Sequence, residues 1–299
     1  MQICNGILFI IQKANFRGFK NIEWGRTNIK LKQKGVFTLV KHFWKGAFLL
    51  LLIVVLAACG SKEASTKGMK LVDDGKFTYA SSGEFNPFSV TNKDGTMSGF
   101  DIEVGEAVAK ELGLEPVQHK FKFGGIVEGV KSGRFDAAVA SHTITDERLE
   151  AVNFSVPYYF SGPQIYVRPD SSVETLEDLK GLEVAVAKGT TYTAEAEKAT
   201  NNIKFYDSDV VALEALSKGK HDAVITDFVT GKEAIGAGMN IVGKELLGRS
   251  EQAIAVAKEN TELLEKINKA LEKLHENGTL TEISKKYIGE DITVVPEQE

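Results

Sequence analysis

Three side chains that could hold an anion follow one apolar run of the chain. Ser141, Thr143 and Arg148 come directly after this run, and the residues just before Arg148 are typical of a helix start. The planar guanidinium group of an arginine matches a carboxylate and can hold it by two hydrogen bonds. The spacing therefore indicates a carboxylate site, with a surface ion pair between Arg148 and Asp146 or Glu150 as the alternative.

Two further segments offer complementary groups. Asp227 ends an apolar run, which suits a carboxylate that binds a ligand ammonium or, equally, one that caps the next helix. Thr190 and Thr191 follow another apolar run and open a helix, so backbone amides and hydroxyls face an anion beyond the strand end. Two anion-holding loops and one isolated carboxylate describe a pocket for a zwitterion. A free α-amino acid is the simplest ligand that carries both charges.

Short apolar runs that alternate with helical periodicity must position these side chains. The runs predict strands at 77–80, 117–120, 137–140, 183–187, 223–226 and 253–257. The periodic stretches predict helices at 100–112, 125–131, 191–199, 210–218 and 261–276. Strands that alternate with helices indicate an α/β fold with a largely parallel sheet, in which ligands bind beyond the carboxyl ends of the strands.

A repeated motif indicates two lobes built on one plan. Residues 133–139 are Gly-Arg-Phe-Asp-Ala-Ala-Val, and residues 219–225 are Gly-Lys-His-Asp-Ala-Val-Ile. Each copy combines a helix stopped by glycine, a turn with a basic residue and an aspartate, and a buried strand. Two copies at a separation typical of a domain predict a duplicated arrangement.

The N-terminal part of the chain is typical of an exported lipoprotein. Residues 47–57 form an apolar run preceded by Lys41 and Lys45, and as a helix they would span about half of a bilayer core. This length fits a signal peptide better than a membrane span. The tetrad Leu56-Ala57-Ala58-Cys59 resembles the bacterial lipoprotein signal. Residues 1–58 are therefore expected to be a leader and Cys59 a lipid anchor, with a short buried helix and a chance cysteine as the alternative.

The charge of the leader differs from that of the rest. Residues 1–58 hold nine Lys and Arg against one acid, and subtraction from 36 and 41 leaves 27 basic and 40 acidic residues over 59–299. An acidic body of this kind makes nucleic acid a poor partner. The five histidines and two cysteines show no metal-ligand spacing, and the sequence motifs of common hydrolases and dinucleotide sites are missing. We therefore expect no metal and no cofactor.

Two boundaries follow from composition. The basic region before the apolar run is unusually long, which suggests that residues 1–35 are not translated and that the start lies nearer the signal. Residues 59–70 are polar and small, and they predict a flexible tether between the anchor and the folded part.

Several motifs occur in a fixed order over residues 71–289. They are Phe85-Asn86-Pro87-Phe88 and residues 95–105, 133–136, 143–148, 153–159, 176–181 and 277–289. As a set they resemble the family 3 extracellular solute-binding proteins. The resemblance implies a bilobed periplasmic-binding-protein fold of type II, in which two α/β lobes are joined by two hinge strands. It also implies delivery of polar amino acids to an importer of the ATP-binding-cassette (ABC) class.

The resemblance also implies roles for single residues. Arg148 would hold the α-carboxylate of the ligand, and Asp227 would bind its α-ammonium. The carboxylate would be reached as well by Ser141, Thr143, Thr190 and Thr191.

Four residues bear on the side chain of the ligand. Phe85 and Phe123 would form apolar walls, with plain core positions as the alternative. Many relatives have an acid where Ser82 stands, so lysine, arginine and histidine are disfavoured as ligands. His142 occupies a position that is often apolar in the family, and we expect it either to touch the ligand or to point to solvent.

The implied lobes follow from hinge strands near 161–166 and 252–257. Residues 71–162 and 254–290 would form lobe 1, residues 163–253 lobe 2, and residues 291–299 a C-terminal tail. We expect a monomer, lipid-anchored on the extracytoplasmic face of the membrane, that binds a free amino acid, serves an ABC permease and performs no chemistry. Two alternatives stay open: a ligand sensor of the same fold, and an exported dehydratase of the cyclohexadienyl type.

Overall fold

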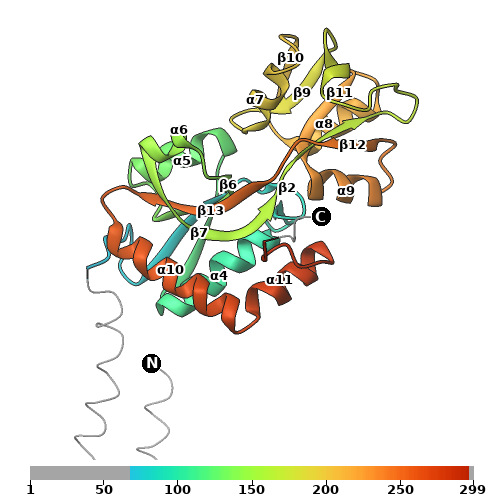
Figure 1. The fold of residues 1–299 in the computed structure, drawn as a ribbon. Coiled ribbons are helices and arrows are strands. Elements are labelled where there is room, and N and C mark those ends of the chain that lie inside the picture. The colour runs from blue at the N-terminus through green and yellow to red at the C-terminus, as the bar shows by residue number, and fades with distance from the viewer. Residues whose placement is uncertain (1–67, 296–299) are drawn as a thin grey trace, which may run out of the picture. The chain divides into compact units, whose positions relative to one another are not determined.

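The structure, a computed structural model, describes residues 68–295. Figure 1 shows two α/β lobes, each built on one five-stranded sheet. The expected leader over residues 1–58 and the expected lipid anchor at Cys59 lie outside the described residues.

The first sheet is the core of lobe 1. Its strand order is β5 (Glu115–Lys120), β1 (Lys76–Ser81), β6 (Ala137–Thr143), β13 (Ser250–Ala257) and β7 (Val152–Ser161). Strand β1 runs parallel to β5 and β6, whereas β13 runs antiparallel to β6 and β7. The helices of this lobe are α4 (Phe100–Leu112), α5 (Phe123–Lys131), α6 (Asp146–Ala151), α10 (Thr261–Glu276) and α11 (Thr279–Ile288). A small antiparallel sheet adds β2 (Glu84–Phe85), β3 (Ser89–Thr91) and β4 (Met97–Ser98).

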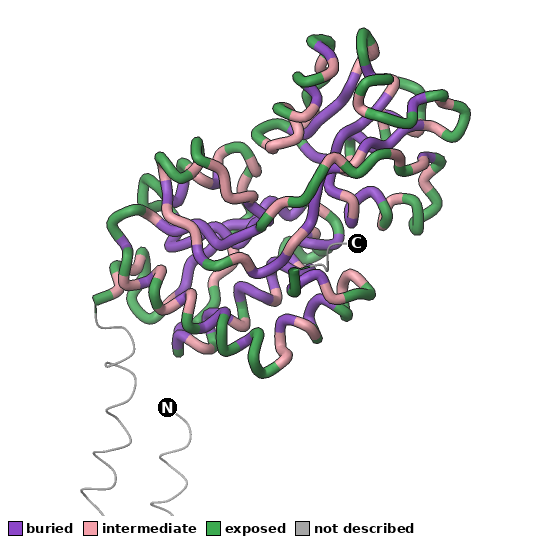
Figure 2. The backbone as a smooth tube through the Cα atoms, viewed as in Figure 1, coloured by how far each residue is buried: buried purple, intermediate pink, exposed green. Residues whose placement is uncertain are grey.

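Both faces of the first sheet are buried, because alternate side chains of its strands belong to two different apolar clusters. Tyr79 and Val139 pack with residues of α4 and α10, whereas Ala80 and Ala138 pack with residues of α5. Figure 2 shows β1 and β6 as buried along most of their length, whereas the edge strand β5 has no buried residue. Burial on both faces is the environment that a parallel sheet requires.

The second sheet is the core of lobe 2 and follows the same rule. Its strand order is β10 (Ile203–Tyr206), β9 (Val184–Ala187), β11 (Ala223–Asp227), β8 (Pro163–Val167) and β12 (Val242–Leu246). Its helices are α7 (Tyr192–Glu197), α8 (Asp209–Ser217) and α9 (Phe228–Gly236), with a 3-10 turn, η1 (Glu177–Leu179). Ile225 and Val224 are neighbours in β11 and belong to different clusters, one on each face.

The repeated motif has the same structural role in both lobes. Asp136 accepts a hydrogen bond from the Thr78 amide at 2.7 Å, and Asp222 accepts one from the Glu183 amide at 2.9 Å. Each aspartate thereby ties its own strand to the neighbouring parallel strand. The three parallel strands also follow the same order in the two sheets, β5-β1-β6 and β10-β9-β11. The predicted bilobed α/β fold is therefore confirmed.

The chain crosses between the lobes twice, and the two crossings touch. The first is at Gly162, between β7 and β8, and the second lies between β12 and β13. A Cβ atom on Gly162 would lie 2.1 Å from the carbonyl oxygen of Gly248, so only glycine allows this approach. The second crossing comes earlier than the expected 252–257, because Ser250 already pairs with Ser161 in the first sheet. Lobe 2 therefore ends before residue 250 and not at residue 253.

The elements expected from the sequence are all present, with bounds that agree within a few residues. Helices α4 and α10 have the predicted bounds, whereas strands β7, β8, β10 and β12 and helix α9 were not predicted from periodicity.

The tether and the tail are both shorter than expected. Met69 packs against the lobe 1 core, and the Lys70 backbone both donates to and accepts from the Asn260 side chain. The expected tail from residue 291 begins inside the fold, because Ile292 is 6% exposed and its carbonyl accepts from the Phe160 amide at 2.9 Å.

Candidate functional site

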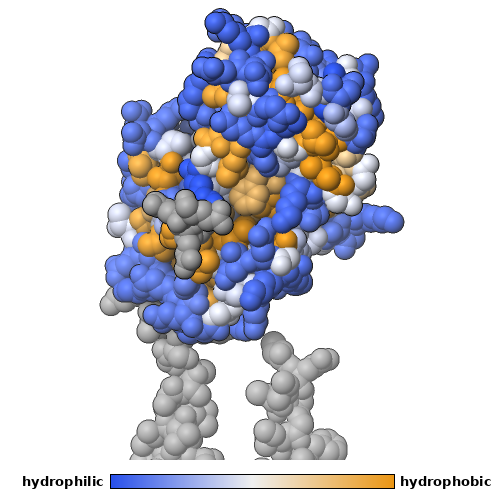
Figure 3. Space-filling model, turned by 45° about the vertical axis from the view of Figure 1, so that its right-hand side comes forward, coloured by the Kyte–Doolittle hydropathy of each residue, from blue (hydrophilic) through white to orange (hydrophobic). Residues whose placement is uncertain are grey.

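A cavity of about 890 Å³ lies between the two lobes. Its size is in the usual range of small-molecule sites. Lobe 1 contributes Ser82, Glu84, Phe85, Lys120, Phe121, Lys122, Phe123, Gly124, Gly125, Ser141, Thr143 and Arg148. Lobe 2 contributes Ala187, Lys188, Thr190, Thr191, Tyr192, Asp207, Ser208 and Asp209. On the face drawn in Figure 3, apolar side chains gather between the two lobes and hydrophilic ones cover most of the remaining surface.

Most of the residues expected at a ligand site line this cavity. They are Ser82, Phe85, Phe123, Ser141, Thr143, Arg148, Thr190 and Thr191. The other two expected residues, His142 and Asp227, are each 1% exposed and do not line it.

Arg148 lies in the first turn of α6 and has donors to spare. Its Nη1 donates to the Thr143 carbonyl at 2.8 Å, and its Nη2 donates to the Gly189 carbonyl at 3.0 Å, which joins lobe 1 to lobe 2. Burial lowers the pKa of Arg148, but a guanidinium stays charged in proteins. Two of its five N–H groups are used in this way, and three remain for an anion. Among the described residues, the alternative ion pair with Asp146 or Glu150 does not form.

His142 stands behind the aromatic wall of the cavity. Its ring stacks on Phe123 with centroids 4.5 Å apart and planes 15° apart. Burial lowers the pKa of His142 well below its usual value, and the nearby charge of Arg148 adds to this effect. The ring is therefore neutral at pH 7. The sequence expectation was wrong for this residue, because His142 neither lines the cavity nor faces solvent.

Asp227 ends β11 and caps α9. Its Oδ1 accepts from the Val229 amide at 2.9 Å, and its Oδ2 accepts from the Ser161 hydroxyl at the end of β7. Burial raises the pKa of Asp227 to about 7. The helix-capping role that the sequence left open is therefore present in the structure, and a cation near Asp227 would offset the cost of its buried charge.

Asp209 is a lining carboxylate that the sequence did not single out. It is 6% exposed, begins α8, and accepts from the Thr226 hydroxyl at 2.6 Å. Burial raises the pKa of Asp209 to about 6, and among residues 68–295 no cation lies within ion-pair distance of it. The charge of Asp209 adds to the raised pKa of Asp227, so the two carboxyl groups lie near each other, Asp209 in the cavity wall and Asp227 buried away from it. We refer to this pair as the acidic end of the site. The Ser208-Asp209 pair is typical of a helix start, but strand β10 before it was not predicted, so the sequence did not indicate that Asp209 follows a strand end.

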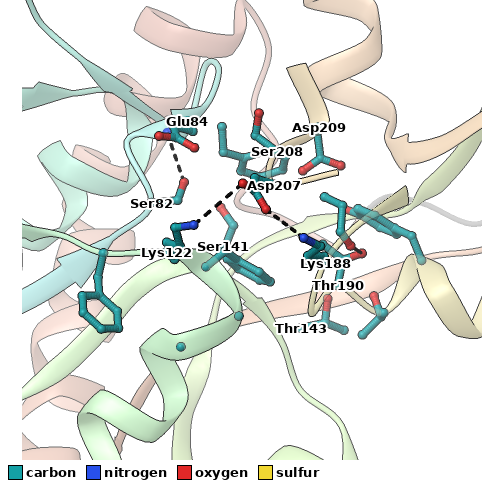
Figure 4. Close-up of a pocket in the computed structure, with 18 of the residues that line it drawn as sticks. Ser82, Glu84, Lys122, Ser141, Thr143, Lys188, Thr190, Asp207, Ser208 and Asp209 are labelled. Atoms are coloured by element: carbon teal, nitrogen blue, oxygen red, sulfur yellow. Dashed lines mark hydrogen bonds and ion pairs between the residues drawn. The ribbon is translucent and has the colours of Figure 1, made fainter. Parts of the chain in front are cut away.

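Charged side chains join the lobes at the mouth of the cavity. Lys122 of lobe 1 lies 3.7 Å from Asp207 of lobe 2, and Lys188 lies 3.1 Å from the same carboxylate (Figure 4). Lys120 and Glu84 form a third pair at 2.8 Å within lobe 1. All of these side chains are substantially exposed, so each pair contributes little to stability.

Four smaller contacts complete the wall. The Ser82 hydroxyl lies 3.1 Å from the Ser89 hydroxyl and accepts from the Glu84 amide at 3.2 Å, as Figure 4 shows for the second contact. Phe85 stacks on the buried Phe88 at 4.9 Å. Thr190 donates its hydroxyl to the Ala187 carbonyl at 2.8 Å.

The described residues contain no group of three or more side chains placed to hold a metal ion. Over the same residues, no helix is both long and apolar enough to cross a membrane.

Comparison with known proteins gives consistent matches over most of the chain. The profile of the bacterial extracellular solute-binding proteins, family 3, matches residues 77–290. The probable amino-acid-binding protein YxeM of Bacillus subtilis (strain 168) is 32% identical over 84% of this chain and 97% of its own length. The L-cystine-binding protein TcyJ of Escherichia coli (strain K12) is 30% identical over 84% of this chain and 98% of its own. The solved structure of an ancestral arginine-binding protein bound to arginine superimposes with a TM-score of 0.69, at 35% identity, and covers 72% of this chain and 99% of its own.

Proposed function

The chain belongs to family 3 of the bacterial extracellular solute-binding proteins, and on that premise we propose that it captures a free polar amino acid between its two lobes for an ABC importer. The observation that carries this proposal is the cationic Arg148, which lines a cavity bounded by both lobes and keeps free N–H donors. Closure of the lobes around the ligand would produce the form that the permease recognises.

The α-carboxylate would bind at Arg148. Thr143 lies on the same lobe, and Thr190 and Thr191 line the cavity from the other lobe. Ser141 also lines the cavity, but its amide donates to Tyr158 and its hydroxyl to Asp101, so its carbonyl would accept from the ligand ammonium instead. A charge-assisted, bidentate pair inside a closed cleft fixes the orientation of the ligand as well as its affinity.

The α-ammonium would bind at the acidic end formed by Asp209 and Asp227. Burial raises the pKa of both carboxyl groups, and neither forms an ion pair within residues 68–295. The resemblance assigns this role to Asp227, whereas Asp209 is the one that lines the cavity. An ammonium would offset the desolvation of either group.

The side chain of the ligand would lie against Phe85 and Phe123 and near Ser82. A hydroxyl at Ser82 provides no charge for a lysine, arginine or histidine side chain, which favours neutral polar ligands. The matched relatives bind different amino acids, cystine and arginine among them, so family membership alone does not select one.

We also propose that Cys59 carries a lipid that anchors a monomer to the extracytoplasmic face of the cell membrane. The support is the sequence of residues 47–59. Mass spectrometry of the protein from membranes tests this, because diacylation of Cys59 adds a fixed mass that C59A cannot carry.

The direct test of the function is a ligand screen. Ligand at 100 times its Kd stabilises a protein by about 2.7 kcal/mol, which a thermal-shift assay detects readily. We expect a shift with at least one polar amino acid among the twenty, cystine and ornithine. Absence of any shift would contradict the proposal and would favour the dehydratase alternative, which turnover of a prephenate-like compound would then test.

Arg148→Ala should abolish most of the binding found in that screen. Truncation of one partner of a buried charge pair costs about 2 to 5 kcal/mol, or roughly thirtyfold to several thousandfold in Kd by calorimetry. Arg168→Ala is the matched control, because Arg168 donates to the His221 carbonyl in lobe 2 and does not line the cavity. Unchanged affinity in the Arg148 variant would contradict the assignment of the ligand carboxylate to Arg148.

A further inference from the structure

Ser141 has an unusual backbone conformation. Its φ of 56° is the only positive φ of a non-glycine residue among residues 68–295. An L-residue in this left-handed region is strained and persists only where its surroundings hold it.

The strain coincides with a bulge in β6. Ala253 pairs with His142 and Ala255 pairs with Ala138, so two steps along β13 span four steps along β6. The extra residues of β6 include Ser141, which therefore leaves the regular ladder at the cavity wall. Bulges of this kind redirect a residue next to a binding site.

A buried network holds Ser141 from behind. The Ser141 amide donates to the Tyr158 hydroxyl at 3.0 Å, and the Ser141 hydroxyl donates to Asp101 Oδ2 at 2.8 Å. The Tyr158 hydroxyl itself donates to Asp101 Oδ1 at 2.6 Å. Asp101 therefore holds Ser141 in two ways: Oδ2 binds the Ser141 hydroxyl directly, and Oδ1 binds the Tyr158 hydroxyl that in turn accepts from the Ser141 amide.

Asp101 is costly to bury, and within residues 68–295 its carboxylate accepts hydrogen bonds from Ser141 and Tyr158 alone. It is 0% exposed and lies in the first turn of α4, where the helix N-terminus favours a carboxylate. Burial nevertheless raises its pKa to about 6. Burial of this carboxylate costs free energy, and its two partners are Ser141 and Tyr158, which itself holds Ser141. A role in ligand binding therefore explains a buried carboxylate here better than a contribution to core stability does.

We propose that Asp101 is a positioning residue for ligand binding, which holds Ser141 in the left-handed conformation and so directs its backbone into the cleft. This rests on the proposed function, since it assigns to a residue outside the cavity the task of presenting Ser141 to the amino acid. Asp101 itself does not touch the ligand.

A double-mutant cycle tests the proposal. D101N replaces one acceptor oxygen by a donor, so Ser141 and Tyr158 can no longer both donate to it, and we expect the affinity for the best ligand to fall about tenfold. S141G removes the need for a hold, because glycine adopts positive φ without strain. D101N should therefore cost at least threefold less affinity in the S141G background than in the wild-type background.

Two further variants separate positioning from general stability. Y158F removes the hydroxyl that links Ser141 to Asp101, and it should lower affinity in the same direction as D101N and be rescued likewise by S141G. D136N alters another buried carboxylate of lobe 1, which accepts hydrogen bonds from the Thr78 amide and hydroxyl and takes no part in the network around Ser141. D136N should lower Tm and leave Kd unchanged at a temperature where the variant is folded. An equal loss from D101N in both backgrounds would overturn the proposal.

Hydrogen exchange of the Ser141 amide supplies a readout that needs no ligand. In ligand-free protein the amide should be protected, and D101N should raise its exchange rate at least tenfold while the amides of β1 keep theirs. Unchanged protection in D101N would overturn the positioning role even if no amino acid bound. Failure of every amino acid to bind the wild-type protein, with exchange altered as expected, would instead count against the proposed function alone.

Discussion

Two glycines, one from each lobe, lie against each other, and we predict that a side chain at one of them hinders closure of the lobes. Gly189 of lobe 2 lies beside Gly124 of lobe 1, and a Cβ atom on Gly189 would lie 2.8 Å from the Gly124 Cα. Alanine at Gly124 is far milder, because its Cβ would lie 3.6 Å from the nearest atom, the Lys188 carbonyl oxygen. The same interface therefore offers both a disruptive variant and its matched control.

The magnitude for Gly189→Ala has two parts. The φ of Gly189 is 79°, which strains an alanine in the open and closed forms alike, so this part cancels from the binding free energy. The contact at 2.8 Å exists only when the lobes meet. Overpacking of this kind costs about 1 to 3 kcal/mol, so Kd should rise about 5- to 150-fold.

Calorimetry with the ligand found in the screen measures this change, and small-angle scattering measures closure. We expect Gly189→Ala to bind weakly and to remain more extended with ligand, and Gly124→Ala to stay within about threefold of wild type. Equal affinities of the two variants, or a greater loss in Gly124→Ala, would refute the reasoning, because the distances of 2.8 and 3.6 Å predict the opposite order.

Three other predictions concern the acidic end and the hinge. Asp209→Asn and Asp227→Asn should each lower the calorimetric affinity for an amino acid more than the affinity for the corresponding ligand without an amine. The variant with the larger difference between the two ligands identifies the carboxylate that binds the ammonium. Equal losses of affinity for both ligand types would contradict the ammonium role. Burial raises the pKa of Asp227 to about 7, so the folded protein takes up a proton as pH falls through 7 while the unfolded chain, near 3.8, does not. The free energy of unfolding should therefore gain about 2 to 3 kcal/mol from this group between pH 8 and pH 5, and in ligand-free melts Asp227→Asn should be most stable relative to wild type at pH 8; a pH-independent difference would contradict this. Gly162→Ala should separate the two crossings and change both the scattering profile and Kd, because its Cβ would lie 2.1 Å from the Gly248 carbonyl oxygen. Gly236→Ala, whose Cβ would have nothing within 4 Å, should leave both measurements unchanged.

The sequence predicted the elements whose side chains alternate between a buried and an exposed environment, or between two buried clusters. Helix α10 is an example, since its buried residues recur along one face, and its bounds agree with those predicted. Strand β7 was not predicted, because Val152–Ser161 mixes buried, half-buried and exposed residues without a regular period. Its position depends on pairing with β13, about a hundred residues later in the chain, which local patterns do not contain.

The site was predictable where function follows a strand end and not where it depends on packing. Thr143 ends β6 and Arg148 follows it, and the apolar pattern revealed this strand. Asp209 was missed because it follows β10, a short strand in which Lys204 and Phe205 are both exposed, so that no buried apolar run marks it. The place of His142 behind Phe123 depends on which face of the bulged β6 it occupies, and the bulge is a tertiary property.

The position of the two crossings also sets an order for folding. All of lobe 2 lies between Gly162 and Gly248 in the chain, whereas β13, an interior strand of the first sheet, comes only after it. As the chain emerges N-terminus first, lobe 2 is complete while β6 and β7 still lack the strand that joins them. The lobe that begins the chain must therefore finish folding last, with its core open until β13 arrives.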